Sequence, residues 1–187
     1  MTSIEEHYCK EPNKFPLSRF YQRGSGKGKH ILIVGESPAE NGWRKSGKAF
    51  YNTNGKILAS GKRLNLLLSD FGLSVETCGF TELAKCFVGK NRKALFNCSK
   101  CCWSIFLKQL EFEDYELIIL LGVQTLTVFN KLSNLNLKIG RLSKAILNDK
   151  EYYLLPIYHP SPINPYGFKR NHLIFEKQDI KQLLRQG

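Results

Sequence analysis

The sequence predicts an α/β fold, a three-layer α/β/α sandwich around a central, mainly parallel sheet of four strands. Two patterns support this fold class. Runs of branched aliphatic residues, of which residues 31–34 are the clearest, are typical of strands buried on both faces. These runs alternate four times with segments whose apolar residues recur at helical spacing, and such alternation favours parallel strands joined by helices.

The elements follow from these patterns in chain order. Helical spacing predicts one helix over 58–71, ended by Gly72, and two more over 103–110 and 126–132. Residues 142–151 are expected to form a turn between short strands, and the apolar residues near position 183 mark a closing helix. The four main strands are expected at residues 31–34, 76–81, 115–121 and 152–157.

Residues 1–29 show little periodicity, and we expect them to form an N-terminal arm and basic linker within a single domain spanning 1–187. Residues 23–29 resemble a phosphate-binding loop in composition, but their spacing is wrong and they precede a strand. The first residues lack the features of a secretory signal or transit peptide, and no apolar run approaches the roughly 20 residues of a membrane helix. A cytoplasmic location is therefore expected.

The formal net charge is +12, from 28 Lys and Arg against 16 Asp and Glu. Such an excess suits a polyanionic partner, of which nucleic acid is the commonest, although a basic surface can also serve solubility alone. We also expect a monomer, because no exposed apolar helix face stands out. The basic residues cluster at 23–29, 44–48, 56–63 and 85–93.

Two loops that follow buried strands carry polar residues suited to chemistry. Glu36 and Ser37 follow the first strand, and His159 follows the last. Because ligands of open α/β sheets bind at the carboxyl ends of strands, we expect these loops to face each other across one cleft. Glu36 could position or activate a water molecule, and His159 could donate a hydrogen bond to developing negative charge.

Each of these residues also has a purely structural interpretation. Glu36 could be a surface carboxylate that caps a loop, and His159 a structural histidine. Phe50 could stack on a planar ligand or belong to the core. Residues 161–164 could form a stiff wedge beside a groove or only a sharp turn.

The segments taken together resemble the uracil-DNA glycosylase superfamily. Residues 35–50, GESPAENGWRKSGKAF, resemble its motif one, with ends like those of the family 4 and family 5 enzymes. Residues 159–164, HPSPIN, resemble motif two, and residues 81–86, TELAKC, lie where family 4 has T-N-x-x-K-C. The resemblance extends from about residue 31 to residue 164 and keeps the motif order.

This resemblance implies a monofunctional DNA repair glycosylase that flips uracil or a related deaminated base out of DNA and hydrolyses its N-glycosidic bond. By resemblance, Glu36 would position the water and His159 would stabilise the departing base. Phe50 would stack on the base, Ser161 would hold a phosphate, and Ile163 would wedge into the gap left by flipping. The substrate-binding residues would be Ser37, Phe50, Glu82, Ser161, Ile163 and Asn164.

One departure from family 4 concerns Glu82, which stands where that family reads uracil with an asparagine. An ionised carboxylate only accepts hydrogen bonds and would repel O4 of uracil. Either Glu82 is protonated, or backbone groups read uracil, or the preferred base differs. Because motif one also lacks its usual aspartate, an alternative is a catalytically impaired relative that binds damaged or single-stranded DNA. An unrelated nucleotide-binding protein is disfavoured, since no phosphate-binding glycine loop follows a strand.

A second departure concerns the cysteines. Six cysteines in a cytoplasmic chain argue against a disulfide framework, and metal ligation or buried thiols remain as interpretations. Family 4 carries a 4Fe–4S cluster, so the resemblance implies ligands that include Cys86 and Cys102, with Cys9 in the first position. Cys98 is our choice for the fourth ligand, with Cys101 and His7 as alternatives. A cluster, zinc and no metal all remain open, and the hydrolysis itself requires none.

Overall fold

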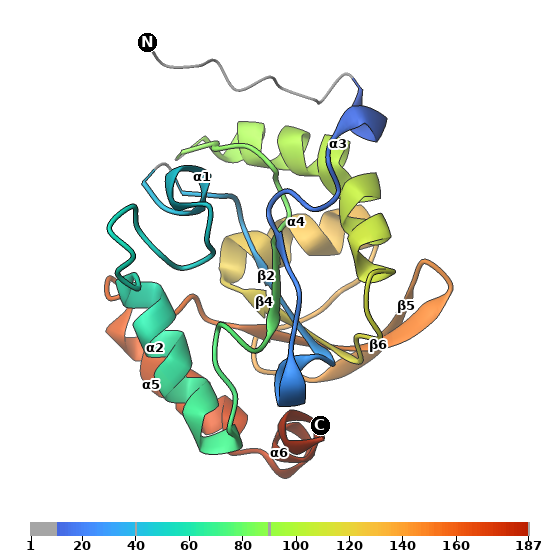
Figure 1. Cartoon of the computed structure of the whole chain (residues 1–187). Helices are drawn as coiled ribbons and strands as arrows, with labels where there is room; N and C mark the ends of the chain where they lie inside the picture. Colours follow the sequence, from blue (N-terminus) through green and yellow to red (C-terminus); the bar gives the residue numbers. More distant parts are fainter. Residues whose placement is uncertain (1–10, 40, 90, 187) are drawn as a thin grey trace.

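The computed structural model describes residues 11–39, 41–89 and 91–186, which form a mixed six-stranded sheet with the order β1-β3-β2-β4-β6-β5 (Figure 1). The four central strands run parallel to one another. They are β3 (Gly79–Glu82), β2 (Ile31–Gly35), β4 (Leu117–Leu121) and β6 (Lys150–Ile157).

The prediction of four strands is therefore correct for the parallel centre and wrong for the whole sheet. Two edge strands, β1 (Tyr21–Gln22) and β5 (Ser143–Leu147), pair antiparallel with β3 and β6. β1 has only two residues, which are too few to leave a periodic pattern. β5 forms a hairpin with β6 at the place where a turn between short strands was predicted. Its two turn residues, Asn148 and Asp149, both have positive φ, as a tight hairpin turn requires.

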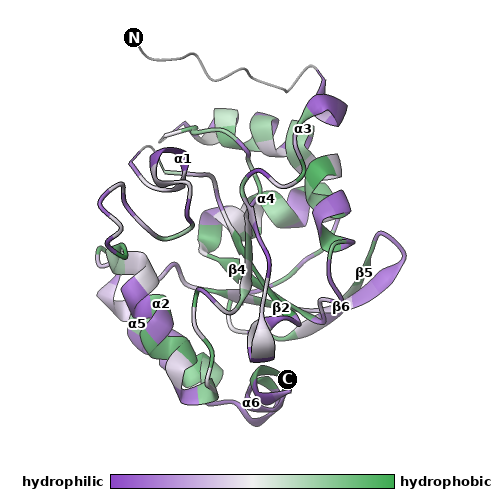
Figure 2. Cartoon of the chain, viewed as in Figure 1, coloured by the Kyte–Doolittle hydropathy of each residue, from purple (hydrophilic) through white to green (hydrophobic). Residues whose placement is uncertain are grey.

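The central strands are aliphatic because both faces of the sheet are covered. Every residue of β2 and β4 is buried. One face packs against α2 (Ala59–Leu68), α5 (Pro165–Phe175) and α6 (Gln178–Arg185). The other packs mainly against α3 (Arg92–Leu110) and α4 (Val123–Ser133), and Figure 2 shows the strands between these layers as predominantly hydrophobic. The predicted three-layer sandwich is confirmed.

Helix boundaries differ from the predicted ones in two places. α3 begins at Arg92, earlier than its apolar spacing indicated, because the Asn91 side chain caps it by accepting a hydrogen bond from the Ala94 amide at 2.9 Å. α5 was not predicted. It begins at Pro165 after the capping residue Asn164, whose Oδ1 accepts from the Gly167 amide at 2.8 Å. In the described part of the chain, no helix is both long and apolar enough to cross a membrane.

Shorter elements lie in the loops around this frame. α1 (Trp43–Ser46) interrupts the long loop after β2. The residues before β3 that were expected to extend it form a turn instead, in which the Cys78 amide donates to the Ser74 carbonyl at 3.0 Å. The remaining short helices are η2 (Pro12–Lys14), η3 (Gly26–Gly28) and η4 (Ser69–Phe71).

Candidate active site

A cavity of about 180 Å³ opens at the carboxyl ends of the parallel strands. Glu36 and Ser37 reach it from the end of β2, Glu82 from the end of β3, and His159 from the segment after β6. The two predicted loops thus meet at one cavity, as expected for an open α/β sheet. Its other lining residues are Gly35, Ala39, Gly42, Trp43, Phe50, Leu58, Ser60, Phe80 and Leu121.

Backbone hydrogen bonds hold the Glu36 segment in place. The Gly35 carbonyl accepts from the Leu83 amide at 3.0 Å, and the Glu36 carbonyl accepts from the Ala84 amide at 3.0 Å. These bonds continue the β2–β3 pairing beyond the strand ends and tie the two loops together. The half-buried Glu36 side chain is therefore presented from a rigid backbone.

His159 lies at the rim of the cavity, where it keeps an accessible surface. Surrounding protein atoms nevertheless lower the pKa of its imidazole by desolvation, which favours the neutral ring. Nδ1 accepts a hydrogen bond from the Ser161 amide at 3.2 Å, so the neutral ring carries its proton on Nε2. His159 is thus arranged as a hydrogen-bond donor through Nε2.

Gly122, between β4 and α4, lies against the side chain of His159. Its φ of +93° is a conformation that L side chains rarely adopt. A Cβ at this position would also lie 3.0 Å from the Cβ of His159. Both backbone conformation and space therefore require glycine here.

An aromatic wall forms one side of the cavity. The ring of Phe50 lies 4.4 Å from that of Phe80, centroid to centroid, and Phe80 lies 5.3 Å from Trp43. Phe50 has a φ of +62°, which is strained for a bulky side chain and costs roughly 1–3 kcal/mol. Its carbonyl accepts from the Leu58 amide at 2.7 Å, and a Cβ on Gly61 of α2 would come within 2.8 Å of its Cβ. The fold therefore stabilises a strained residue beside the cavity.

Glu82 is the most deeply buried carboxyl of this site, with 7% of its surface exposed. It is paired in register with Gly35, where an added Cβ would lie 2.1 Å from Glu82 Oε2. The carboxyl group therefore occupies the space that a side chain at position 35 would need. Burial raises the pKa of Glu82 to about 8, with a further contribution from the nearby Glu36 and opposition from Lys85.

A buried network around Lys85 supports the end of β3, and sequence reasoning did not identify it. Lys85 Nζ donates to Thr81 Oγ1 at 2.7 Å, to the Glu82 carbonyl at 2.6 Å and to Gln109 Oε1 at 2.7 Å. Three acceptors match the three hydrogens of an ammonium group. The available signal was a lysine within an otherwise apolar segment, since such a residue must find buried partners.

The same network reaches the N-terminal arm. Thr81 Oγ1 donates to the Phe20 carbonyl at 2.9 Å, and Gln109 Nε2 donates to the Leu17 carbonyl at 2.7 Å. Residues far apart in sequence thus fix the strand that carries Glu82.

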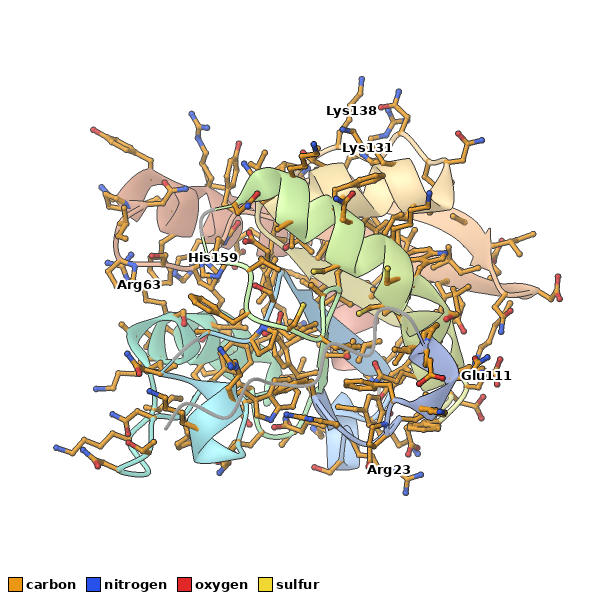
Figure 3. The ribbon with its side chains drawn as sticks, turned by 90° about the horizontal axis from the view of Figure 1, so that it is seen from above. Arg23, Arg63, Glu111, Lys131, Lys138 and His159 are labelled. Atoms are coloured by element: carbon orange, nitrogen blue, oxygen red, sulfur yellow. The ribbon has the colours of Figure 1, made fainter. Side chains whose placement is uncertain are left out.

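Three predicted substrate-binding residues lie beside the cavity and do not line it. Ser161 and Asn164 form a turn in which the Ser161 carbonyl accepts from the Asn164 amide at 3.0 Å. Asn164 also caps α5, so it has a structural role, and Ile163 projects from the turn with 93% of its surface exposed. Arg63 of α2 donates to the Ser161 carbonyl at 3.0 Å, and Figure 3 shows Arg63 on the same side of the fold as His159.

The predicted metal ligands lie on α3 and just after β3. Cys98 and Cys102 are one helical turn apart on α3, and burial raises the pKa of the Cys102 thiol. Cys102 Sγ also accepts from the Lys85 amide at 3.4 Å. Cys9, the proposed first ligand, lies outside the described residues, and within the described ranges no three His, Cys, Asp or Glu side chains gather at one point. The ligand set stays a prediction.

Comparison with protein families matches residues 23–183 to the uracil DNA glycosylase superfamily. The cavity and the turn after His159 both lie within the matched residues. A search of curated proteins found no match.

Proposed function

The chain belongs to the uracil-DNA glycosylase superfamily, and from this premise we propose that it hydrolyses the N-glycosidic bond of uracil or a related deaminated base in DNA. The observation that supports this proposal most directly is the single cavity that joins Glu36, Phe50 and His159. A base stacked inside a duplex cannot enter such a cavity, so it must first be flipped out of the helix.

Breaking the glycosidic bond places negative charge on the departing base and positive charge on the sugar. His159 would donate from Nε2 to a carbonyl oxygen of the base, because the Ser161 amide already occupies Nδ1. A preorganised donor of this kind typically contributes about 10²–10³ in rate. Desolvation lowers the pKa of His159 and so favours the neutral imidazole, in which Nδ1 can accept from the Ser161 amide while Nε2 donates.

Glu36 would act on the other reacting partners. A carboxylate at the end of β2 can accept a hydrogen bond from the attacking water and stabilise the cationic sugar. Phe50, held beside Phe80, would stack on the face of the flipped base. In these roles, His159 stabilises the negative charge on the departing base, and Glu36 stabilises the positive charge on the sugar.

The surroundings of the cavity suit a DNA backbone. The net charge is +12, and a second hollow that shares Trp43 with the cavity is lined by Arg19 and Arg44. Ile163 would enter the space that the flipped base leaves in the stack. Phosphate contacts make affinity fall steeply with salt.

A single-turnover glycosylase assay tests this proposal. End-labelled oligonucleotides would each carry one uracil, hypoxanthine or xanthine, as single strand and as duplex, with undamaged DNA as the control. We expect alkali-labile abasic sites at one or more of the damaged bases. Salt-dependent DNA binding without any base release would instead indicate a DNA-binding module.

A further inference from the structure

The carboxyl group of Glu82 is buried in the cavity wall without its full set of hydrogen bonds. Oε2 has negligible exposed surface and no hydrogen-bond partner among the described residues. Glu82 and Gly35, against which the carboxyl lies, both line the cavity. Leaving a buried polar atom unpaired destabilises a protein, so such an atom beside an open cavity indicates a ligand that would complete its bonding.

Among the described residues, no cation is bonded to this carboxyl group. Lys85 acts electrostatically on Glu82, but its three hydrogens go to Thr81, to Gln109 and to the backbone carbonyl of Glu82. Glu36, from the end of β2, adds negative charge. Desolvation lowers the pKa of His159, on the opposite loop, which favours its neutral ring. Burial is the largest influence on Glu82 and favours its protonated form, Lys85 opposes that form, and Glu36 adds to it.

We propose that Glu82 recognises the base through a neutral carboxyl group, which donates one hydrogen bond to the base and accepts another from it. A carboxylic acid offers one O–H donor and an adjacent acceptor, whereas a carboxylate offers acceptors alone. The complementary ligand edge has a ring N–H next to a carbonyl, the lactam edge shared by uracil, hypoxanthine and xanthine. This inference rests on the proposed function and names the chemical group that reads the base.

Burial supports this assignment because it raises the pKa of Glu82 to about 8. The carboxyl group is then about nine-tenths neutral at pH 7 and about one-tenth neutral at pH 9. These two hydrogen bonds alone do not distinguish uracil from thymine, because thymine has the same lactam edge. Another part of the cavity must therefore exclude the methyl group of thymine.

The first test compares base release by the wild type, Glu82→Gln and Glu82→Ala from pH 6 to pH 10. Glutamine keeps one donor and one acceptor and cannot ionise. We expect the wild-type rate to fall about tenfold per pH unit above about 8. Glu82→Gln should retain the pH 7 rate within about threefold and lack this fall, and Glu82→Ala should lose at least about tenfold at pH 7.

Glu82→Gln also controls for ionisation of the base itself, which occurs in alkali and would affect both proteins alike. The same alkaline fall in the wild type and Glu82→Gln would overturn the inference, as would full activity of Glu82→Ala. Both outcomes would leave the proposed glycosylase activity intact. Absence of base release by the wild type at every pH would instead refute the proposed function.

A second measurement does not depend on activity. A protonated carboxyl group has an infrared carbonyl band that a carboxylate lacks. The band should be present in the wild type at pH 7, disappear as the pH rises past about 8, and be absent from Glu82→Gln. Glu76→Gln is the matched control, because Glu76 is exposed and its bond from Lys48 lowers its pKa, so this variant should keep the band. A wild type without the band at pH 7 would overturn the inference.

Discussion

Replacing Glu82 by glutamine should stabilise the protein increasingly as the pH rises from about 4.5 to about 8. Burial raises the pKa of this carboxyl group from 4.5 to about 8 on folding. Between these values the folded protein keeps a proton that the unfolded chain has lost, so the free energy of unfolding falls as the pH rises. Glutamine has no proton to lose and removes this fall.

The magnitude follows from the same pKa difference. Each pKa unit corresponds to about 1.4 kcal/mol, so the loss reaches about 3 kcal/mol at pH 7 and about 5 kcal/mol once Glu82 is fully ionised. Lys85 acts in the opposite direction at higher pH, because burial lowers its pKa and the folded protein then holds fewer protons than the unfolded chain. Because Glu82 raises the pKa of Lys85, the two proteins are compared only up to pH 7, so that most of the difference comes from Glu82.

Urea unfolding of the wild type and Glu82→Gln between pH 5 and pH 7 measures this effect. The difference in free energy of unfolding should change by a few kcal/mol across the range, in favour of Glu82→Gln at the alkaline end. Glu76→Gln provides the control, because the lowered pKa of Glu76 places its titration below 4.5 and its difference from wild type should stay flat. A difference between wild type and Glu82→Gln that is independent of pH would refute the reasoning.

Three further substitutions test other parts of the site. His159→Ala should lower single-turnover base release by about 10²–10³ with little change in DNA affinity, and unchanged turnover would remove His159 from the mechanism. Ile163→Ala should leave urea stability unchanged, because the side chain is 93% exposed, and should slow base release from duplex more than from single strands; equal slowing on both would argue against a wedge. Lys85→Met should lower the free energy of unfolding by roughly 2–4 kcal/mol in urea, since it removes the buried hydrogen bonds from Lys85 to Thr81, to Gln109 and to the Glu82 carbonyl; a loss below about 0.5 kcal/mol would contradict a structural role.

The sequence predicts the parallel centre of the sheet well because its strands are buried on both faces. The aliphatic runs of β2 and β4 result directly from that environment. The edge strand β1 left no such pattern, because it has two residues and depends on pairing with β3. α5 was missed although Asn164 and Pro165 are typical of a helix start, since the proline-rich loop was interpreted as a turn or a wedge.

The sequence predicted site residues only where they belong to recognisable motifs. Glu36, Phe50 and His159 lie in segments with recognisable order, and the structure places all three at one cavity. The strained backbone of Phe50 and the partners of Lys85 could not be predicted. They depend on contacts between distant segments, such as the bond from Thr81 to the Phe20 carbonyl. Burial of Glu82, and hence its raised pKa, depends on the same tertiary packing.

The hydrogen bonds between the arm and the Lys85 network set a minimum length for any shortened form of this protein. The family match begins at residue 23, yet Leu17 and Phe20 supply carbonyls to the network, and Phe15 and Phe20 are buried in the core. A chain that started at residue 23 would also lose β1 and leave the edge of β3 uncovered. The structural limit of this fold therefore lies before the segment that matches the family.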